Sequence, residues 1–272
     1  MQSLRVTACI LKFPMKTDAA GASALPGVNV HSFSKSYGRG RYRKTALRGV
    51  DFSATAGEVT GILGLNGAGK STLLKAVCGI HCPTEGHVEV CGQKEADCIR
   101  RITAYVPELP VLDTRLTVRE TLFFSALLHG IPENRCDSAA LSAAVRCGVQ
   151  NVLPSKISVL SKGYVQRTAL AAALASDCPV LVLDEATAGL DPAQAVQVRG
   201  LLKELARTKC IIFSTHRIEE AETLCGKICI LSGGRLAAAG TPADLLQQSG
   251  CSTLEAAFLS ITGSKSGLEE EA

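Results

Sequence analysis

The hydrophobic residues of this 272-residue chain gather in short apolar runs that alternate with longer segments of mixed polarity. Short apolar runs bounded by glycine or polar residues are typical of buried strands, and longer periodic segments are typical of helices. The pattern predicts strands at 28–33, 50–54, 58–63, 88–91, 104–106, 180–183 and 211–214, and two more near Ile228 and Leu236. It predicts helices at 70–78, 117–129, 137–147, 192–206 and 217–224, and another near the C-terminus. Such strand–helix alternation indicates an α/β fold with a mostly parallel sheet.

The segment from about 110 to 165 differs from its flanks because its predicted helices have no strands between them. Thr117 and Glu120 form the pattern of a capping box, which predicts a helix start at this point. We therefore interpret this middle region as helical and set apart from the strand-rich flanks, while the length of the chain permits one large α/β domain or two small ones.

The two ends of the chain differ in composition from the residues between them. Residues 1–27 contain an apolar stretch that Lys12 interrupts and then a segment rich in Ala, Gly and Ser, so we expect no regular structure there. Met15 is the only other methionine and is a second candidate start of translation. Residues 263–272 form a polar tail. Because no run approaches the ~18 apolar residues of a membrane span, we expect none.

Composition and charge narrow the classes of function. A chain that is 46% hydrophobic and 20% charged is typical of a soluble globular protein. Its net charge of +4 is too small to indicate nucleic-acid binding without a localised basic patch. One such patch lies in a segment that we expect to be an exposed hairpin loop, either simply solvated or in contact with phosphate or an acidic partner. Its basic residues are Lys35, Arg39, Arg41, Arg43, Lys44 and Arg48.

The twelve cysteines do not indicate disulfides or zinc. They include no C-x-x-C pair, the commonest spacing of zinc ligands on one segment. Several others lie inside apolar runs, so we expect most of the thiols to be small core residues of a protein in a reducing compartment.

A glycine-rich loop between the strand at 58–63 and the helix at 70–78 is the strongest chemical signal. Its sequence GLNGAGKST matches G-x-x-x-x-G-K-[ST], a pattern whose backbone N–H groups and helix N-terminus hold phosphate. Lys70 is expected to reach the β- and γ-phosphates, and the Ser71 hydroxyl is expected to bind Mg²⁺. The predicted nucleotide-binding loop comprises Gly64, Leu65, Asn66, Gly67, Ala68, Gly69, Lys70, Ser71 and Thr72.

Two strand ends supply the remaining groups that such a site needs. Asp184 ends the apolar strand at 180–183, where its carboxylate suits the Mg²⁺ shell. Glu185 follows it and is expected to polarise a water near the γ-phosphate. His216 follows the strand at 211–214 and would lie beside Asp184 if the two strands are neighbours, with the γ-phosphate as its partner.

In this order, the motifs resemble those of the ATP-binding subunit of ABC transporters, over residues from about 28 to 262. LSKGYVQR at 160–167 is similar to the family's signature motif, in the variant of the branch that serves drug, sodium, polysaccharide and gliding-related export. Tyr37 falls at the family's adenine-stacking aromatic, Asp191 falls in its D-loop, and His216 falls at its switch histidine. GTPADLL near the C-terminus is similar to the family's closing segment.

The resemblance implies that residues 28–262 form a single domain. It would have an α/β P-loop NTPase (RecA-like) core with a mostly parallel sheet, an N-terminal antiparallel β subdomain and a helical subdomain at about 110–165. It implies ATP hydrolysis with ATP and Mg²⁺, in a homodimer or a heterodimer with a related subunit. Ser161 and Gly163 of one subunit would contact the phosphate of an ATP held by Lys70 of the other. It also implies a separately encoded membrane permease, and transport that favours export. The chain would then be cytoplasmic and peripheral, on the inner face of the cell membrane, with no nucleic acid among its partners.

Two positions depart from the family's pattern. Glu108 stands where the family usually has glutamine; its carboxylate can still accept a hydrogen bond from a Mg²⁺-bound water, but cannot donate one. Lys162, Gly163 and Tyr164 replace Gly-Gly-Gln in the signature, which keeps Ser161 and one glycine. We expect activity with altered metal coupling.

Two other classes of function are weaker alternatives. A soluble ABC ATPase that acts on nucleic acid or ribosomes would carry two cassettes, or long coiled coils between Lys70 and Asp184, and this chain has one phosphate loop and no heptad run there. A P-loop kinase or small-molecule synthetase would leave the signature and His216 unexplained.

Overall fold

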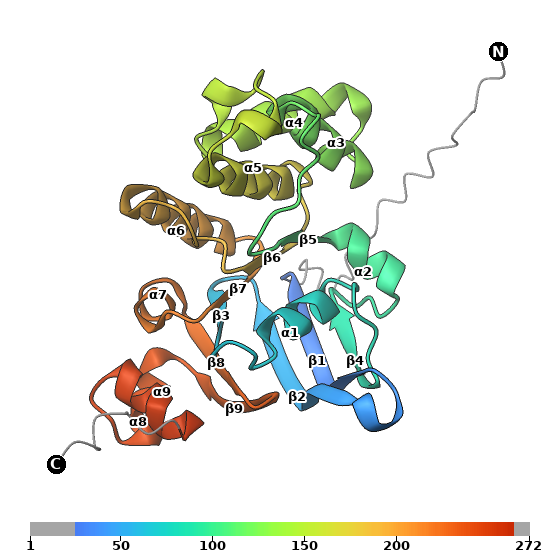
Figure 1. Cartoon of the computed structure of the whole chain (residues 1–272). Coiled ribbons are helices and arrows are strands. Elements are labelled where there is room, and N and C mark those ends of the chain that lie inside the picture. Colours follow the sequence, from blue (N-terminus) through green and yellow to red (C-terminus); the bar gives the residue numbers. More distant parts are fainter. Residues whose placement is uncertain (1–24, 264–272) are drawn as a thin grey trace, which may run out of the picture.

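Two sheets organise the molecule in the computed structural model, which describes residues 25–263 (Figure 1). The smaller sheet is antiparallel and has the order β2-β1-β4. The larger has the order β5-β6-β7-β3-β8-β9 and is parallel except for its last strand. The strands are β1 (Gly27–Tyr37), β2 (Lys44–Thr55), β3 (Val59–Leu63), β4 (Glu85–Val90), β5 (Thr103–Val106), β6 (Val180–Asp184), β7 (Cys210–Thr215), β8 (Lys227–Ser232) and β9 (Arg235–Gly240).

The three central strands of the larger sheet, β3, β6 and β7, are buried at every position. Their continuous apolar sequences are typical of parallel strands that are covered on both faces. The register pairs Leu63 with Thr215 and Asp184 with Ser214. Because parallel strands end at the same edge, the segments that follow these three strands meet there.

The helices divide into a group around the sheets and a separate group of three. Figure 1 shows α3, α4 and α5 packed together at the top of the view. This group comprises α3 (Val118–Leu128), α4 (Glu133–Arg146) and α5 (Lys162–Ala175). The others are α1 (Lys70–Val77), α2 (Ala96–Ile102), α6 (Pro192–Ala206), α7 (Ile218–Leu224), α8 (Pro242–Ser249) and α9 (Leu254–Thr262).

The core lies in two layers, one on each side of the larger sheet. Alternate residues of a strand point to opposite faces. Leu181 and Leu183 therefore belong to the layer that contains residues of α3, α4 and α5, while Val180 and Val182 belong to the layer that contains α1 and the antiparallel sheet. As expected, buried free thiols belong to these layers: Cys78, Cys136, Cys147, Cys178, Cys210, Cys225 and Cys229.

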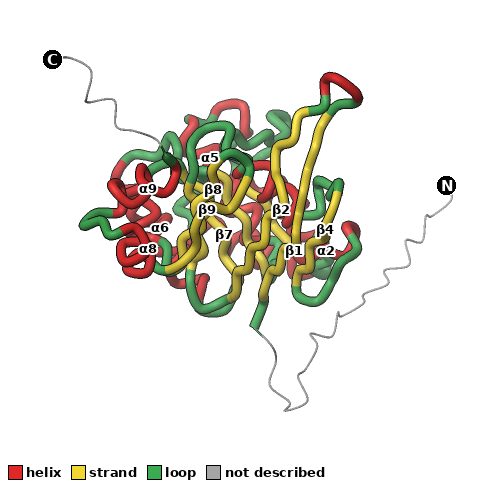
Figure 2. The backbone as a smooth tube through the Cα atoms, turned by 90° about the horizontal axis from the view of Figure 1, so that it is seen from below, coloured by secondary structure: helices red, strands yellow, loops and turns green. Residues whose placement is uncertain are grey.

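Most predicted elements are present, and the largest difference concerns the basic segment. β1 continues to Tyr37 and β2 begins at Lys44, so Lys35, Lys44 and Arg48 belong to strands, and the loop covers only 38–43. The prediction of a longer loop was wrong because cross-strand pairing between β1 and β2 outweighs the weak strand preference of these polar residues. The hairpin projects from the rest of the molecule in Figure 2.

Smaller differences concern element ends. Helix α2 was not predicted, α4 begins at Glu133 just after Pro132, and two helices rather than one follow β9. The capping box at Thr117 is confirmed. β1 begins at Gly27, which lies inside the segment expected to lack regular structure.

The rest of that segment, 1–24 with Met15, and the tail at 264–272 lie outside the described residues. Within the described part of the chain, no helix is both long and apolar enough to cross a membrane.

Candidate functional site

The glycine-rich loop joins β3 to α1 through backbone conformations that favour glycine. Gly67 and Gly69 have φ of 81° and 108°. A Cβ at Gly69 would lie 2.6 Å from Leu47 Cδ2 and 3.0 Å from the Ala46 carbonyl oxygen, so β2 packs directly against the loop. Gly69 is the N-cap of α1 and supplies no capping side chain. The N–H groups of the first turn of α1 are thus available to an anion.

Lys70 is a buried cation whose side chain is held by three oxygen atoms. It is 6% exposed, and its Nζ donates to the carbonyl oxygens of Gly64 at 2.9 Å and Leu65 at 3.3 Å. Glu185 Oε1 lies 3.5 Å from the same nitrogen. The ammonium group is therefore compensated inside the protein, as a buried charge requires.

Asp184 ends β6 with a buried carboxylate that accepts two hydrogen bonds. Ser214 Oγ donates to Oδ1 at 2.5 Å and the Tyr105 hydroxyl donates to Oδ2 at 3.1 Å. Burial raises the pKa of Tyr105, and the negative charge of Asp184 raises it further, so the phenol remains a donor at neutral pH. No role was predicted for Tyr105 or Ser214 from the sequence. Both residues lie on the strands that flank β6, and this position could have indicated that they contact Asp184.

Glu185 and His216 form a pair beyond the strand ends. His216 Nδ1 lies 2.8 Å from Glu185 Oε2, a contact that needs a proton on Nδ1 because a carboxylate only accepts. Glu185 has φ of 49°, a left-handed conformation that costs about 1–3 kcal/mol in a residue other than glycine. Its N–H donates to the Ser214 carbonyl oxygen at 3.1 Å, which holds this conformation.

The expected place of His216 is corrected by the register. Strands β6 and β7 are neighbours, as the expectation required, but Ser214 is the residue opposite Asp184. His216 lies two residues further along and so contacts Glu185 instead.

A cleft of about 620 Å³ lies in front of the glycine-rich loop, within the usual range for ligand sites. It brings together nine of the candidate residues: Tyr37, Asn66, Gly67, Gly69, Lys70, Ser71, Thr72, Glu108 and Glu185. The remaining lining residues were not predicted to belong to the site: Lys44, Thr45, Ala46, Gly233 and Gly234. Of these residues, Lys44 could have been anticipated, because it belongs to the basic segment that was a candidate for contact with phosphate.

The structure does not place Ser161, Gly163 and Asp191 in this cleft. Ser161 caps α5 and its hydroxyl accepts from the Tyr164 N–H, while Asp191 caps α6 and accepts from the Gln194 N–H at 2.8 Å. A Cβ on Gly163 would lie 3.1 Å from Gln194 Oε1, so the starts of α5 and α6 are adjacent. These residues form a second cluster on the surface of the chain.

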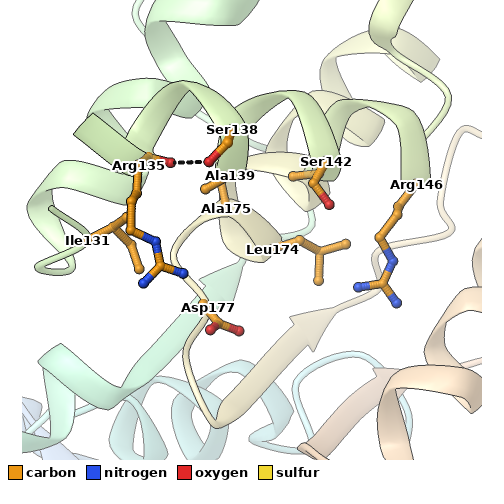
Figure 3. Close-up of a pocket in the computed structure, with 10 residues that line it drawn as sticks. Ile131, Arg135, Ser138, Ala139, Ser142, Arg146, Leu174, Ala175 and Asp177 are labelled. Atoms are coloured by element: carbon orange, nitrogen blue, oxygen red, sulfur yellow. Dashed lines mark hydrogen bonds between the residues drawn. The ribbon is translucent and has the colours of Figure 1, made fainter. Parts of the chain in front are cut away.

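A further groove, of about 300 Å³, lies between α4 and the end of α5 (Figure 3). Two of its charged residues have partners of their own. Arg146 pairs with Glu204 at 2.9 Å, and Asp177 pairs with Lys209 at 2.8 Å. The groove therefore offers weaker ligand chemistry than the cleft at Lys70.

Known proteins similar to this chain are ATP-binding proteins of ABC transporters. The family model for ABC transporters matches residues 47–188. Nod factor export ATP-binding protein I of Rhizobium meliloti (strain 1021) is 36% identical over 246 residues, which cover 89% of this chain and 72% of the relative. The protein of the same name from Paraburkholderia xenovorans (strain LB400) is 37% identical over 230 residues, which cover 81% and 73% of the two chains.

Solved structures give the same picture for the fold. The structure of an ATP-binding subunit of an ABC transporter matches with a TM-score of 0.80 and 31% identity, and covers 86% of this chain and 99% of that chain. A dimeric ATP-binding cassette in a post-hydrolysis state, bound to ADP and Pi, matches with a TM-score of 0.74 and 27% identity, and covers 79% and 98%. These matches confirm the expected P-loop NTPase fold.

Proposed function

The chain belongs to the ABC transporter family as an ATP-binding subunit that hydrolyses ATP, and from this premise we propose how its residues act. The cleft at Lys70 takes the phosphates of ATP. Lys70 and the N–H groups of the first turn of α1 bind them, and Tyr37 at the rim stacks on the adenine. The observation that supports this assignment is the shared cleft, which places an aromatic ring, a phosphate loop and a carboxylate in one space.

The oxygen donors at this site suit Mg²⁺. Ser71 and Glu108 line the cleft, and Asp184 is held beside it by Tyr105 and Ser214. Hydroxyl and carboxylate oxygens are the ligands that Mg²⁺ prefers. Ser71 and Asp184 would hold the ion and Glu108 a water bound to it. When bound, the metal neutralises charge that develops on the phosphate oxygens.

Glu185 is the general base of the proposed reaction. A base needs a carboxylate close to the γ-phosphate and a second group that orients it. Lys70, the expected phosphate ligand, is 3.5 Å from Glu185 Oε1, and His216 holds the other oxygen at 2.8 Å. His216 therefore orients Glu185 and is itself near enough to contact the γ-phosphate.

The proposed active unit contains two ATP-binding chains, identical or related. The N-terminus of α5 at Ser161 is exposed and lies outside the cleft of its own chain. A hydroxyl and a helix N-terminus suit a γ-phosphate that a second chain presents. Two chains that face each other would each complete the site of the other, with Asp191 beside the contact.

A separate membrane permease is the proposed partner for transport. Helix α3 and the segment before it expose large apolar side chains, which exposed helices normally avoid. These are Leu109, Val111, Phe124, Leu127 and Leu128. We assign them to the contact with the permease, which would hold the chain at the inner face of the membrane. Export is the proposed direction because the curated relatives are named as export proteins.

A Glu185→Gln variant tests the two-chain site. It keeps the size of the side chain and removes the base, so it should bind ATP, hydrolyse it at least a hundredfold more slowly and accumulate as a dimer with ATP and Mg²⁺. Light scattering during size-exclusion chromatography would measure the dimer. The control is Glu222→Gln, at an exposed position on α7, which should hydrolyse ATP and elute as the wild type does. A Glu185→Gln chain that stays monomeric in saturating ATP and Mg²⁺ would contradict the proposal.

A further inference from the structure

A buried carboxylate on α7 lies outside the roles described so far. Glu220 is 5% exposed and both of its oxygens accept hydrogen bonds from threonine hydroxyls. Thr187 donates to Oε1, and Thr215 donates to Oε2 at 2.8 Å. Burying a carboxylate is unfavourable unless its oxygens are satisfied, so the two hydroxyls account for its presence there.

The two threonines belong to the two segments that carry the proposed catalytic pair. Thr187 follows Glu185 by two residues, in the loop between β6 and α6. Thr215 comes directly before His216, and its hydroxyl also accepts from the Arg217 N–H at 3.0 Å. One carboxylate therefore ties together both segments and the backbone turn that carries the histidine.

The position of Glu220 separates this role from nucleotide binding. Glu220, Thr187 and Thr215 are all 5% exposed or less, and they lie outside the set of residues that line the cleft. These residues do not contact the nucleotide in the proposed site, so a direct effect of a change in them on the reaction would act through the placement of Glu185 and His216. Hydrogen bonds that position a catalytic group affect turnover, because a displacement of about 1 Å can lower the rate a hundredfold.

We propose that Glu220 is a positioning residue for ATP hydrolysis, which clamps the loop after Glu185 to the strand end before His216 through Thr187 and Thr215. The proposal rests on the roles assigned above to Glu185 and His216. The clamp keeps the histidine at hydrogen-bonding distance from the carboxylate and limits the motion of the left-handed turn at Glu185.

The test uses single substitutions that remove one hydroxyl and keep the side-chain size. In the full chain, Thr187→Val and Thr215→Val should each lower kcat for ATP hydrolysis by about tenfold to a hundredfold. The KM for ATP should stay within about twofold, because substrate contacts are unchanged. Thr187→Ser and Thr215→Ser keep the donor and should restore kcat. Glu222→Gln, on the exposed side of α7, is the matched control.

Thermal unfolding of each variant separates positioning from simple stabilisation. A purely structural role predicts a lower unfolding temperature with wild-type kcat in the folded protein, and that result would overturn the proposal. A raised KM at unchanged kcat would overturn it as well. Glu185→Gln measured in parallel keeps the two proposals distinct. If it abolishes hydrolysis while both valine variants are fully active, only the clamp is wrong. If Glu185→Gln hydrolyses ATP normally, the assignment of the base is wrong.

Discussion

The N-termini of α1 and α5 are both candidate phosphate ligands, yet their surroundings differ. The first turn of α1 follows Gly69, which supplies no capping side chain, and it opens into the cleft beside buried Lys70. The first turn of α5 is capped by the hydroxyl of Ser161 and is exposed on the surface.

The difference indicates what each helix end can do alone. At α1, the glycine-rich loop lies in one cleft with Lys70, Glu108 and Glu185. This end therefore suits an anion that also carries a metal. At α5, one hydroxyl and the helix dipole are present without a cleft around them. In the proposed two-chain site, the end of α5 supplies one half and the cleft of a second chain supplies the other.

The largest expected effect comes from removing the cation at α1. Lys70→Ala should lower kcat for ATP hydrolysis by about a hundredfold to a thousandfold, because a preorganised charge at the developing negative charge is lost. Initial-rate measurements at saturating ATP would determine it. Lys75→Ala, on the same helix but outside the residues lining the cleft, is the control. Wild-type turnover in Lys70→Ala would remove the distinction between the two helix ends.

Substitution at α5 should affect turnover without affecting the cleft. Ser161→Ala removes a hydrogen bond to a charged phosphate, so kcat should fall by about tenfold to a hundredfold. Binding of a fluorescent ATP analogue to the single chain should be unchanged. The lost cap should also cost about 1 kcal/mol of stability, seen as a lower unfolding temperature.

Mixing the two impaired variants, Lys70→Ala and Ser161→Ala, tests directly whether the two helix ends of one site come from different chains. In a mixed dimer, one composite site carries both substitutions and the other carries neither. An equal mixture of Lys70→Ala and Ser161→Ala chains should therefore recover about a quarter of wild-type activity for a symmetric dimer. If each chain supplies both helix ends to its own ATP, the mixture will stay as inactive as its components.

The rim of the cleft should show a smaller effect. Tyr37→Ala removes the aromatic stacking proposed for the adenine, worth about 0.5–1.5 kcal/mol, so the KM for ATP should rise by about twofold to tenfold. Tyr42 is the matched control, because it is an exposed tyrosine at the tip of the same hairpin. Equal effects of Tyr37→Ala and Tyr42→Ala would mean that the hairpin, and not the ring at the cleft, matters.

The last prediction concerns the stability of the core beneath both helix ends and not the rate of turnover. Burial raises the pKa of Cys147, packed near α5, from 9.0 to about 12, and that of Cys229 in β8 to about 11. Above pH 9 the unfolded chain releases protons that the folded chain keeps, so the free energy of unfolding should fall as pH rises toward those values.

Urea unfolding at pH 8, 9 and 10, followed by circular dichroism, would measure this slope, at most about 1.4 kcal/mol per pH unit for each thiol. Cys147→Ala and Cys229→Ala should each make the slope shallower. A slope that only one of them changes would mean that the two layers of the core respond differently to alkaline pH.

Prediction from sequence succeeded where a short stretch contains the whole signal. The residues of the glycine-rich loop, with Lys70 and Ser71, were found from one pattern, and six of them line the cleft. The helix predicted at 192–206 was likewise found from the local pattern, and it is present as α6. The basic hairpin was less predictable, since its polar strands are held by pairing with each other and not by an apolar pattern.

Patterns in the sequence predict the candidate reactive groups and the strand ends on which they lie, because turn, cap and strand preferences act between near neighbours in the chain. Which of these groups meet depends on the tertiary structure. The register of β6 and β7 places Ser214 opposite Asp184, and His216, two residues further along, contacts Glu185. The packing of α7 placed Glu220 between Thr187 and Thr215. Such contacts join residues far apart in the chain, and their geometry depends on sheet register and side-chain packing that no local pattern encodes.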